Sequence, residues 1–220
     1  MTSLPGVWAF LVLVLLPALA LPVGAAEPAD PKCPKGAVLK GDKPPKARKQ
    51  WCSLEDGTQH GPSVSYYESG QRRAHANFDK GELDGEYRAW HPSGQIAESA
   101  IYSHDARDGA SRTWDPAGNQ LTEENYSDGR LDGKTRVWFP GGGVMVEASY
   151  SDGLRDGPAL TYYESGQKRT EGTFRKDAYH GTWRGWYEDG SLEKVAEFDE
   201  GKELSRETFP RDSGETGDGS

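Results

Sequence analysis

The sequence predicts an all-β, elongated body made of six 24-residue hairpin repeats, and three observations support this fold class. Two sets of glycines recur at this spacing: Gly61, Gly85, Gly109, Gly133, Gly157 and Gly181, and Gly70, Gly94, Gly118, Gly142, Gly166 and Gly190. Two aromatic columns keep the same period: Tyr66, Trp90, Trp114, Trp138, Tyr162 and Trp186, and Phe78, Tyr102, Tyr126, Tyr150, Phe174 and Phe198. No insertion or deletion interrupts the units, and a fixed short period is typical of a repeat array.

One unit, from Gly85 to Gly109, shows why each repeat is expected to form a hairpin. Residues 86–91 predict a short strand with aromatic side chains. Pro92-Ser93-Gly94-Gln95 predicts a turn, because glycine adopts a positive φ without strain. Residues 96–102 predict the second strand, and residues 103–109 a loop into the next unit. Two units carry Asp105 or Asp177 in the first glycine slot of this loop, where Asp tolerates left-handed backbone.

The second strand of each unit has a period of two, which places a small residue and a ring on the same face. The pairs are Ala76 with Phe78, Ala100 with Tyr102, Ala148 with Tyr150, Gly172 with Phe174, and Ala196 with Phe198. A small residue leaves room for a ring from a neighbouring strand. Glu124 interrupts this column, so the middle of the array is expected to be looser.

The repeat pattern extends backwards into a half-unit at Trp51 to Leu54. Leu54 falls in the ring slot and Cys52 in the small slot, and Asp56-Gly57 matches the later inter-unit loops. Cys33 and Cys52 are the only cysteines, and in an exported chain such a pair usually forms a disulfide. Two free thiols are the alternative; a metal site would need further ligands. The disulfide is expected to tie the leader onto the first strand and to protect the edge of the sheet.

The chain divides into four regions by composition. Residues 1–26 are uncharged with an apolar run and predict a signal peptide cleaved after Ala20 or Ala26, hence an exported protein; an uncleaved membrane anchor is the alternative. Residues 27–50 predict a Pro/Lys-rich leader, residues 51–204 the repeat array, and residues 205–220 a disordered acidic tail. Whether the protein stays in the periplasm or cell envelope, or is secreted, is left open.

The formal charge of −9 is unevenly distributed along the chain. Residues 27–50 carry seven basic and three acidic residues, whereas residues 51–204 carry 17 basic and 28 acidic residues. An acidic repeat body disfavours nucleic acid as a partner, because phosphate binding needs clustered basic side chains. It also disfavours attachment to anionic lipid.

The repeated string resembles the MORN repeat, in the variant found in bacterial proteins. The first copy reads His60-Gly61, Tyr66-Tyr67, Gly70-Gln71, Phe78 and Gly81, and the resemblance covers about residues 51–204. It implies an elongated, single-layer antiparallel β-meander. Many such proteins are named as antitoxins of the YwqK type, and others are discussed as scaffolds or lipid binders. A signal peptide is at odds with a cytoplasmic antitoxin.

The sequence shows no catalytic constellation, cofactor motif or metal-ligand cluster. His60 and His180 occupy a loop slot that Asp fills in other units, and His75, His91 and His104 are expected to be solvated. We therefore expect a non-catalytic module that binds or scaffolds proteins, with no cofactor. An antitoxin-like neutraliser of one toxin is the alternative function. Neither the partner nor the oligomeric state follows from the sequence.

One candidate binding surface is a ladder of arginines, each two residues before a tryptophan. Its members are Arg88 and Trp90, Arg112 and Trp114, Arg136 and Trp138, and Arg184 and Trp186. Residues two apart on a strand share a face, where Arg over Trp can contribute about 0.5–2 kcal/mol by cation–π contact. The ladder would bind an anionic or aromatic partner. Alternatively, the arginine stems only cover the rings. Val64 and Leu160 in the same slot favour this covering role.

Overall fold

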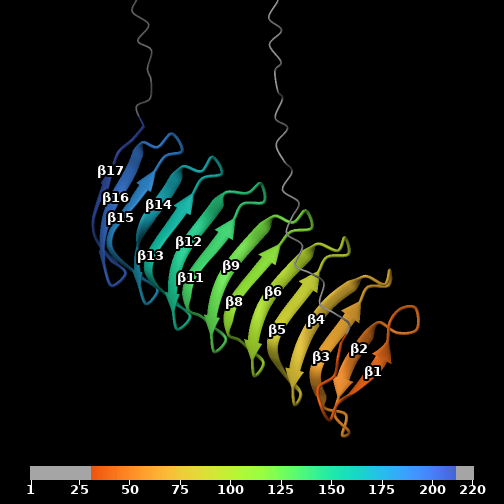
Figure 1. Ribbon diagram of the computed structural model, residues 1–220. Helices are drawn as coiled ribbons and strands as arrows, with labels where there is room; N and C mark the ends of the chain where they lie inside the picture. Colours follow the sequence, from red (N-terminus) through yellow and green to blue (C-terminus); the bar gives the residue numbers. More distant parts are fainter. Residues whose placement is uncertain (1–30, 212–220) are drawn as a thin grey trace, which may run out of the picture.

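The computed structural model describes residues 31–211, and all their regular secondary structure is β-strand. The predicted signal peptide, its cleavage site and residues 212–220 lie outside this range. The strands form one 17-stranded antiparallel sheet, in a single layer that extends along one long axis (Figure 1). The predicted all-β hairpin array is therefore confirmed. Within residues 31–211 no helix has the length and apolar character needed to cross a membrane.

The strands follow one another across the sheet in chain order. The first nine are β1 (Val38–Asp42), β2 (Lys49–Ser53), β3 (Gln59–Tyr66), β4 (Arg72–Asp79), β5 (Glu82–Trp90), β6 (Ile96–Ser103), β7 (Ala106–Arg107), β8 (Gly109–Trp114) and β9 (Gln120–Ser127). The others are β10 (Arg130–Leu131), β11 (Gly133–Trp138), β12 (Val144–Ser151), β13 (Leu154–Tyr162), β14 (Lys168–Arg175), β15 (Ala178–Trp186), β16 (Leu192–Asp199) and β17 (Lys202–Thr208). The short strands β7 and β10 precede β8 and β11, where the other units have one continuous strand.

Both connections of each unit are tight turns, so the predicted inter-unit loop is wrong. In the unit starting at Gly85, residues Ala106–Arg107 of the predicted loop form β7, and only His104 and Asp105 make the turn. Two consecutive residues with positive φ recur in all such turns: Lys80-Gly81, His104-Asp105, Asp128-Gly129, Asp152-Gly153, Lys176-Asp177 and Glu200-Gly201. Turns of this kind match the right-handed twist of the flanking strands, so the strands can pair right up to the turn.

The glycines at the start of each unit create a bulge. Gly157 has φ 116°, and a Cβ there would approach the Ser149 Cβ to 3.1 Å. Where β12 pairs with β13, a step of two positions along β12, from Ala148 to Tyr150, is matched by a step of four along β13, from Ala159 to Arg155. Because the bulge adds two residues, side chains on either side of it keep the same face.

The first strands differ from the predicted half-unit by one residue. Ser53, instead of Leu54, pairs in the row of the ring slot, opposite Gln59. The reason is the connection: Leu54 accepts the N–H of Gly57 and donates to Thr58, which makes a longer turn than the two-residue turns between later units. The predicted slots of Cys52 and Leu54 are therefore wrong. The predicted disulfide between Cys33 and Cys52 is confirmed. The expected protection of the sheet edge is wrong, because residues of the predicted leader form β1, which pairs with β2 and is itself exposed at the edge.

The last strand also departs from the pattern. β17 continues to Thr208, into residues predicted as a tail, and Ser205 replaces the glycine that would start a seventh unit. Its bulge holds one extra residue instead of two, since Glu197 pairs with Ser205 and Phe198 with Glu203. Arg206 therefore faces Ala196.

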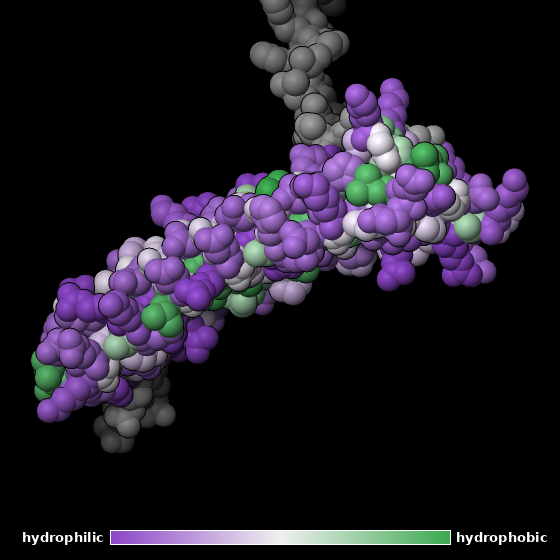
Figure 2. Space-filling view, turned by 90° about the horizontal axis from the view of Figure 1, so that it is seen from below, coloured by the Kyte–Doolittle hydropathy of each residue, from purple (hydrophilic) through white to green (hydrophobic). Residues whose placement is uncertain are grey.

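Among residues 31–211 no second layer packs on either face of the sheet, so the buried side chains are mostly small. They include Ala100, Ala148, Ala159, Ala196, Ser111 and Thr135, together with Phe174 and Tyr66. The side of the molecule seen in Figure 2 is mostly hydrophilic, with hydrophobic residues in small separate groups. Stability must come from many strand-to-strand contacts instead of one thick core.

Candidate functional site

The four predicted arginines lie in one row that crosses the sheet. Cross-strand pairing places one residue of each successive strand in this row: Val64, His75, Arg88, Ser99, Arg112, Glu123, Arg136, Glu147, Leu160, Glu171, Arg184 and Val195. Because directly opposite residues share a face, we call this side of the sheet the arginine face.

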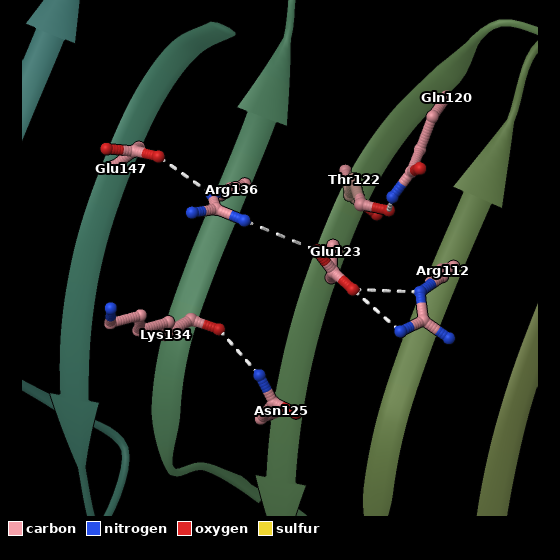
Figure 3. A network of polar contacts seen from close by, with 8 residues as sticks. All are labelled: Arg112, Gln120, Thr122, Glu123, Asn125, Lys134, Arg136 and Glu147. Carbon is pink, nitrogen blue, oxygen red and sulfur yellow. Dashed lines mark hydrogen bonds and ion pairs between the residues drawn. The ribbon is translucent and has the colours of Figure 1, made fainter.

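In the middle of the row, arginine and glutamate alternate (Figure 3). Arg112 donates to Glu123 Oε1 from Nε at 2.9 Å and from Nη2 at 2.7 Å. Arg136 donates from Nε to Glu147 Oε1 at 2.7 Å, and its Nη1 lies 4.0 Å from Glu123 Oε2. The Glu147 carboxylate raises the pKa of Arg136 by this hydrogen bond. An anionic partner would have to compete with these glutamates.

The outer arginines are in different surroundings. Arg88 pairs with Glu86 of its own strand at 3.1 Å. Arg184 lies opposite Glu171, but that carboxylate binds Lys168 Nζ at 2.8 Å, and Arg184 forms no ion pair with residues 31–211. The four arginines therefore do not form a uniform charged ladder.

The predicted stacking of arginine on tryptophan is absent from residues 31–211, where no cation–π contact joins a ladder arginine to its tryptophan. Lys168 lies 5.4 Å from the Trp186 ring instead. For Arg112 and Arg136 the physical reason is that the carboxylates of the next strand bind the guanidinium groups. That the row binds a partner stays a prediction.

The prediction that His91 is solvated is wrong, because its side chain links two units. Its Nε2 lies 2.8 Å from the Trp114 carbonyl oxygen, so this nitrogen carries the proton and donates. Tyr67 and Tyr163 occupy the same slot and donate their hydroxyls to the carbonyls of Trp90 and Trp186. His91 therefore replaces a tyrosine that holds the next hairpin.

The other histidines hold varied positions. His75 is half-buried in the row, next to Arg88, so it is not fully solvated as predicted. His104 sits exposed in its turn, as predicted, and His60 and His180 lie beside Asp79 and Asp199 at 3.1 and 3.6 Å. Residues 31–211 hold no group of three or more His, Cys, Asp or Glu placed to bind a metal.

The opposite side of the sheet, which we call the small-residue face, carries the ring column. In its middle, Arg107 donates to Glu98 at 2.7 Å and to the hydroxyls of Tyr102 and Tyr126 at 3.3 Å each. The pKa of Arg107 is raised, mainly by its hydrogen bond to the Tyr102 hydroxyl.

Glu124 joins this network, because it accepts the Tyr126 hydroxyl at 3.0 Å. It stands opposite the buried Ser111, whose small side chain leaves room for it. The sequence predicted looser packing at Glu124, whereas the structure holds this side chain by a hydrogen bond.

At the C-terminal end of this face, four rings form a cluster that sequence reasoning missed. Phe174 lies 4.9 Å from both Tyr179 and Trp183, and Tyr179 lies 4.7 Å from Trp183 and 5.1 Å from Phe198. An open groove of about 390 Å³ runs over it, lined by Tyr179, Trp183 and Phe198 with Lys194, Glu203 and Arg206. We call this the aromatic groove. Tyr179 is 43% exposed, so the groove offers ring surface to solvent.

The signal for the groove was present in the sequence. Tyr179 takes a slot that Leu83, Arg107, Leu131 and Arg155 fill in earlier units, and Trp183 one that Ser63, Tyr87, Ser111, Thr135 and Ala159 fill. The last unit thus carries rings in two slots that are mostly non-aromatic elsewhere. Departures from the repeat, more than the repeat itself, mark this surface.

The comparisons with known proteins support the repeat. A family model described as the MORN repeat variant matches residues 59–80, 83–104, 155–176 and 179–200, on both sides of the middle units. A search of the curated proteins found no match. One matching solved structure is titled "Crystal structure of GtfA/B complex bound to UDP and GlcNAc"; it is 13% identical over 64% of this chain, with a TM-score of 0.22. The match spans 25% of that structure's chain.

Proposed function

We propose that this chain, in which the MORN repeat variant model matches four segments, is an exported, non-catalytic protein that binds or scaffolds other proteins. The observation that carries the proposal is the open single-layer sheet, whose two long faces carry no second layer within residues 31–211. Repeat arrays of this shape generally provide extended binding surfaces. No contact within residues 31–211 favours an antitoxin over a general protein binder.

Export is supported by the Cys33–Cys52 disulfide, which is consistent with an oxidising compartment. Together with the apolar run in residues 1–26, this supports a place in the periplasm, the cell envelope or outside the cell. The acidic repeat body supports a protein partner over nucleic acid or anionic lipid.

Within the array, the aromatic groove is the best candidate for the contact surface. Exposed aromatic rings next to Arg206 are typical of the residues that dominate protein interfaces. The Arg206 guanidinium is held in place by both Glu203 oxygens, at 3.0 and 2.6 Å. The central arginines of the row are likewise paired with glutamates, so it is the exposed ring surface of Tyr179, and not an unpaired charge, that favours the groove.

Affinity capture from cell-envelope extracts tests the proposal with matched variants. Tyr179→Leu with Trp183→Thr removes the rings but uses residues that other units carry in the same slots, so the hairpin is preserved. We expect this variant to lose the partner. The control variant, Arg112→Leu with Arg136→Leu, changes the arginine face instead and is expected to capture the partner as the wild type does. A partner held equally by both variants would overturn the groove assignment, and substrate turnover by the purified protein would overturn the non-catalytic assignment.

A further inference from the structure

The described sheet has two open edges, β1 at one end and β17 at the other (Figure 1). All five residues of β1 and all seven of β17 are exposed. Within residues 31–211, β1 pairs only with β2, and β17 only with β16. An open edge presents N–H and C=O groups that can pair with a further strand.

The two ends carry opposite charge. Residues 31–50, around β1, contain seven basic residues and one acidic residue, Asp42. Residues 187–211, around β17, contain eight acidic and four basic residues. Lys40, Lys46 and Lys49 near β1, and Glu200 and Glu207 near β17, are all exposed.

We infer that β17 of one copy pairs with β1 of a second copy, so that the sheet continues from one chain into the next. Charge decides among the possible edge pairings. Joining two β1 edges would bring two basic ends together, and joining two β17 edges two acidic ends, whereas β17 against β1 joins opposite charges. Charged residues usually protect edges against unwanted strands, and here they select the unlike edge.

Such an interface is head to tail, because the two partners use different surfaces. Interfaces of this type form open chains unless a rotation closes them into a ring. The described array is elongated, with its two edges at opposite ends (Figure 1). The two edges of one chain therefore cannot pair with each other. The association should therefore increase steadily with protein concentration and show no fixed final size.

The register of β17 identifies the backbone groups that would make the contact. Phe209 N donates to Glu193 O, so in an antiparallel ladder the N–H of the preceding residue, Thr208, points away from β16, toward the open edge. Thr208→Pro removes this outward donor and no hydrogen bond to β16. Thr208→Ala is the matched control, because it alters the same exposed side chain and keeps the N–H.

Sedimentation velocity over a wide range of concentration is the first test. We expect wild type and Thr208→Ala to associate in proportion to concentration, and Thr208→Pro to stay monomeric. A wild type that is monomeric throughout would overturn the inference. Association that persists unchanged in Thr208→Pro would also overturn it, because the contact would then lie elsewhere.

Reversing the charge of single side chains provides a second test that keeps every backbone donor and acceptor of the two edge strands. Lys40→Glu with Lys46→Glu leaves five basic and three acidic residues in 31–50, and Glu200→Lys with Glu207→Lys leaves six of each sign in 187–211, so each pair weakens the attraction between unlike ends. Lys80 and Lys176 show that the turn slot of Glu200 accepts lysine. Each variant alone is expected to associate more weakly than wild type. An equimolar mixture is expected to regain association, because the unchanged β1 end of the second variant can pair with the unchanged β17 end of the first. Failure of the mixture to regain association would contradict pairing of unlike ends.

Discussion

Gly172 and Trp183 show how one missing Cβ sets the packing of the small-residue face. A Cβ added at Gly172 would overlap the Trp183 indole ring, whose Nε1 donates to Thr173 O at 3.0 Å. We expect Gly172→Ala to destabilise the protein by about 1–3 kcal/mol, because the ring must shift in a packed site. Urea unfolding followed by tryptophan fluorescence measures this change.

A second substitution separates the clash from other effects of Gly172→Ala. Trp183→Ala removes the ring, and the same slots then hold two alanines, as Ala148 and Ala159 do elsewhere in the array. In the double variant, the penalty of Gly172→Ala should largely disappear. Additive penalties in the double variant would show that the ring is not the cause.

The environment of His75 predicts a pH dependence of stability. Its pKa lies below the ordinary 6.5, first because burial disfavours the charged ring and then because Arg72 and Arg88 repel it. The unfolded chain therefore binds the proton more readily, so stability should fall as the pH drops below 6.5 toward the lower folded pKa.

Comparing the free energy of unfolding at about pH 7.5 and about pH 5.5 tests this effect of His75. His75→Val, which copies Val64 and Val195 of the same row, should lose less stability on acidification than the wild type. An equal loss in both proteins would show that His75 does not contribute.

At the same scale, the sequence predicted backbone conformations better than side-chain contacts. Asp105 and Asp177 have φ of 66° and 67°, which confirms the left-handed slots predicted from the repeat. The role of His91 was missed, because its contact is with a backbone carbonyl of the next unit, and such an acceptor leaves no trace in the side-chain pattern.

Among the elements, the turns between units connect neighbouring hairpins as well as neighbouring strands. Asp105 N donates to Leu83 O at 3.0 Å, and Asp105 Oδ1 accepts the N–H of Leu83 at 2.7 Å. Glycine at this slot, as at Gly129, forms only the first of these bonds. Compared with glycine, the aspartate therefore has a more strained left-handed backbone but forms an additional charge-assisted hydrogen bond.

For Asp105→Gly, opposing effects act on stability. Relief of the left-handed backbone strain is worth about 1–2 kcal/mol. Against this, the greater freedom of glycine in the unfolded chain costs about 0.4–1 kcal/mol, and loss of the bond to an ionised acceptor costs about 1.5–3 kcal/mol. We expect a net loss of stability with faster amide exchange at Leu83. Asp105→Asn, which keeps an acceptor, should lose less; a glycine variant as stable as wild type would show that the bond contributes little.

Besides the loops between units, sequence reasoning misplaced the elements at the two ends of the array. Asp56-Gly57 looks like the later turns, yet the turn from Leu54 to Thr58 is longer and shifts β2 by one residue. At the other end, Ser205 in the glycine slot shortens the bulge and changes the residue that faces Ala196. Period alone predicts the interior units, whereas the ends depend on turn length and on single glycine losses.

At the scale of the whole molecule, each hairpin contacts only its neighbours, so a local change should stay local. The Cys33–Cys52 disulfide closes a loop with a sequence separation of 19, for which chain entropy predicts a stabilisation of about 3 kcal/mol. Replacing both cysteines by serine should speed hydrogen exchange in β1 to β3 and leave β13 to β16 unchanged. Uniform faster exchange, or none at all, would contradict this.

The candidate sites also show what a repeat pattern can and cannot predict across the whole sheet. Arg112 and Glu123 are 11 residues apart in the chain, and only the register brings them together. The arginine column was therefore visible in the sequence, but the glutamates that neutralise it were not. The aromatic groove arises from four rings on β14, β15 and β16 whose contacts likewise depend on strand pairing.

The strand order has a mechanical consequence. Strands in a sheet lie about 4.8 Å apart along their hydrogen bonds, so these bonds point along the long axis of the array. A force that pulls its two ends apart would open the bonds between one pair of strands at a time, as a zipper opens, instead of shearing many at once. The protein should therefore lengthen stepwise at low force, and its interior units should extend in nearly equal steps because they have equal length.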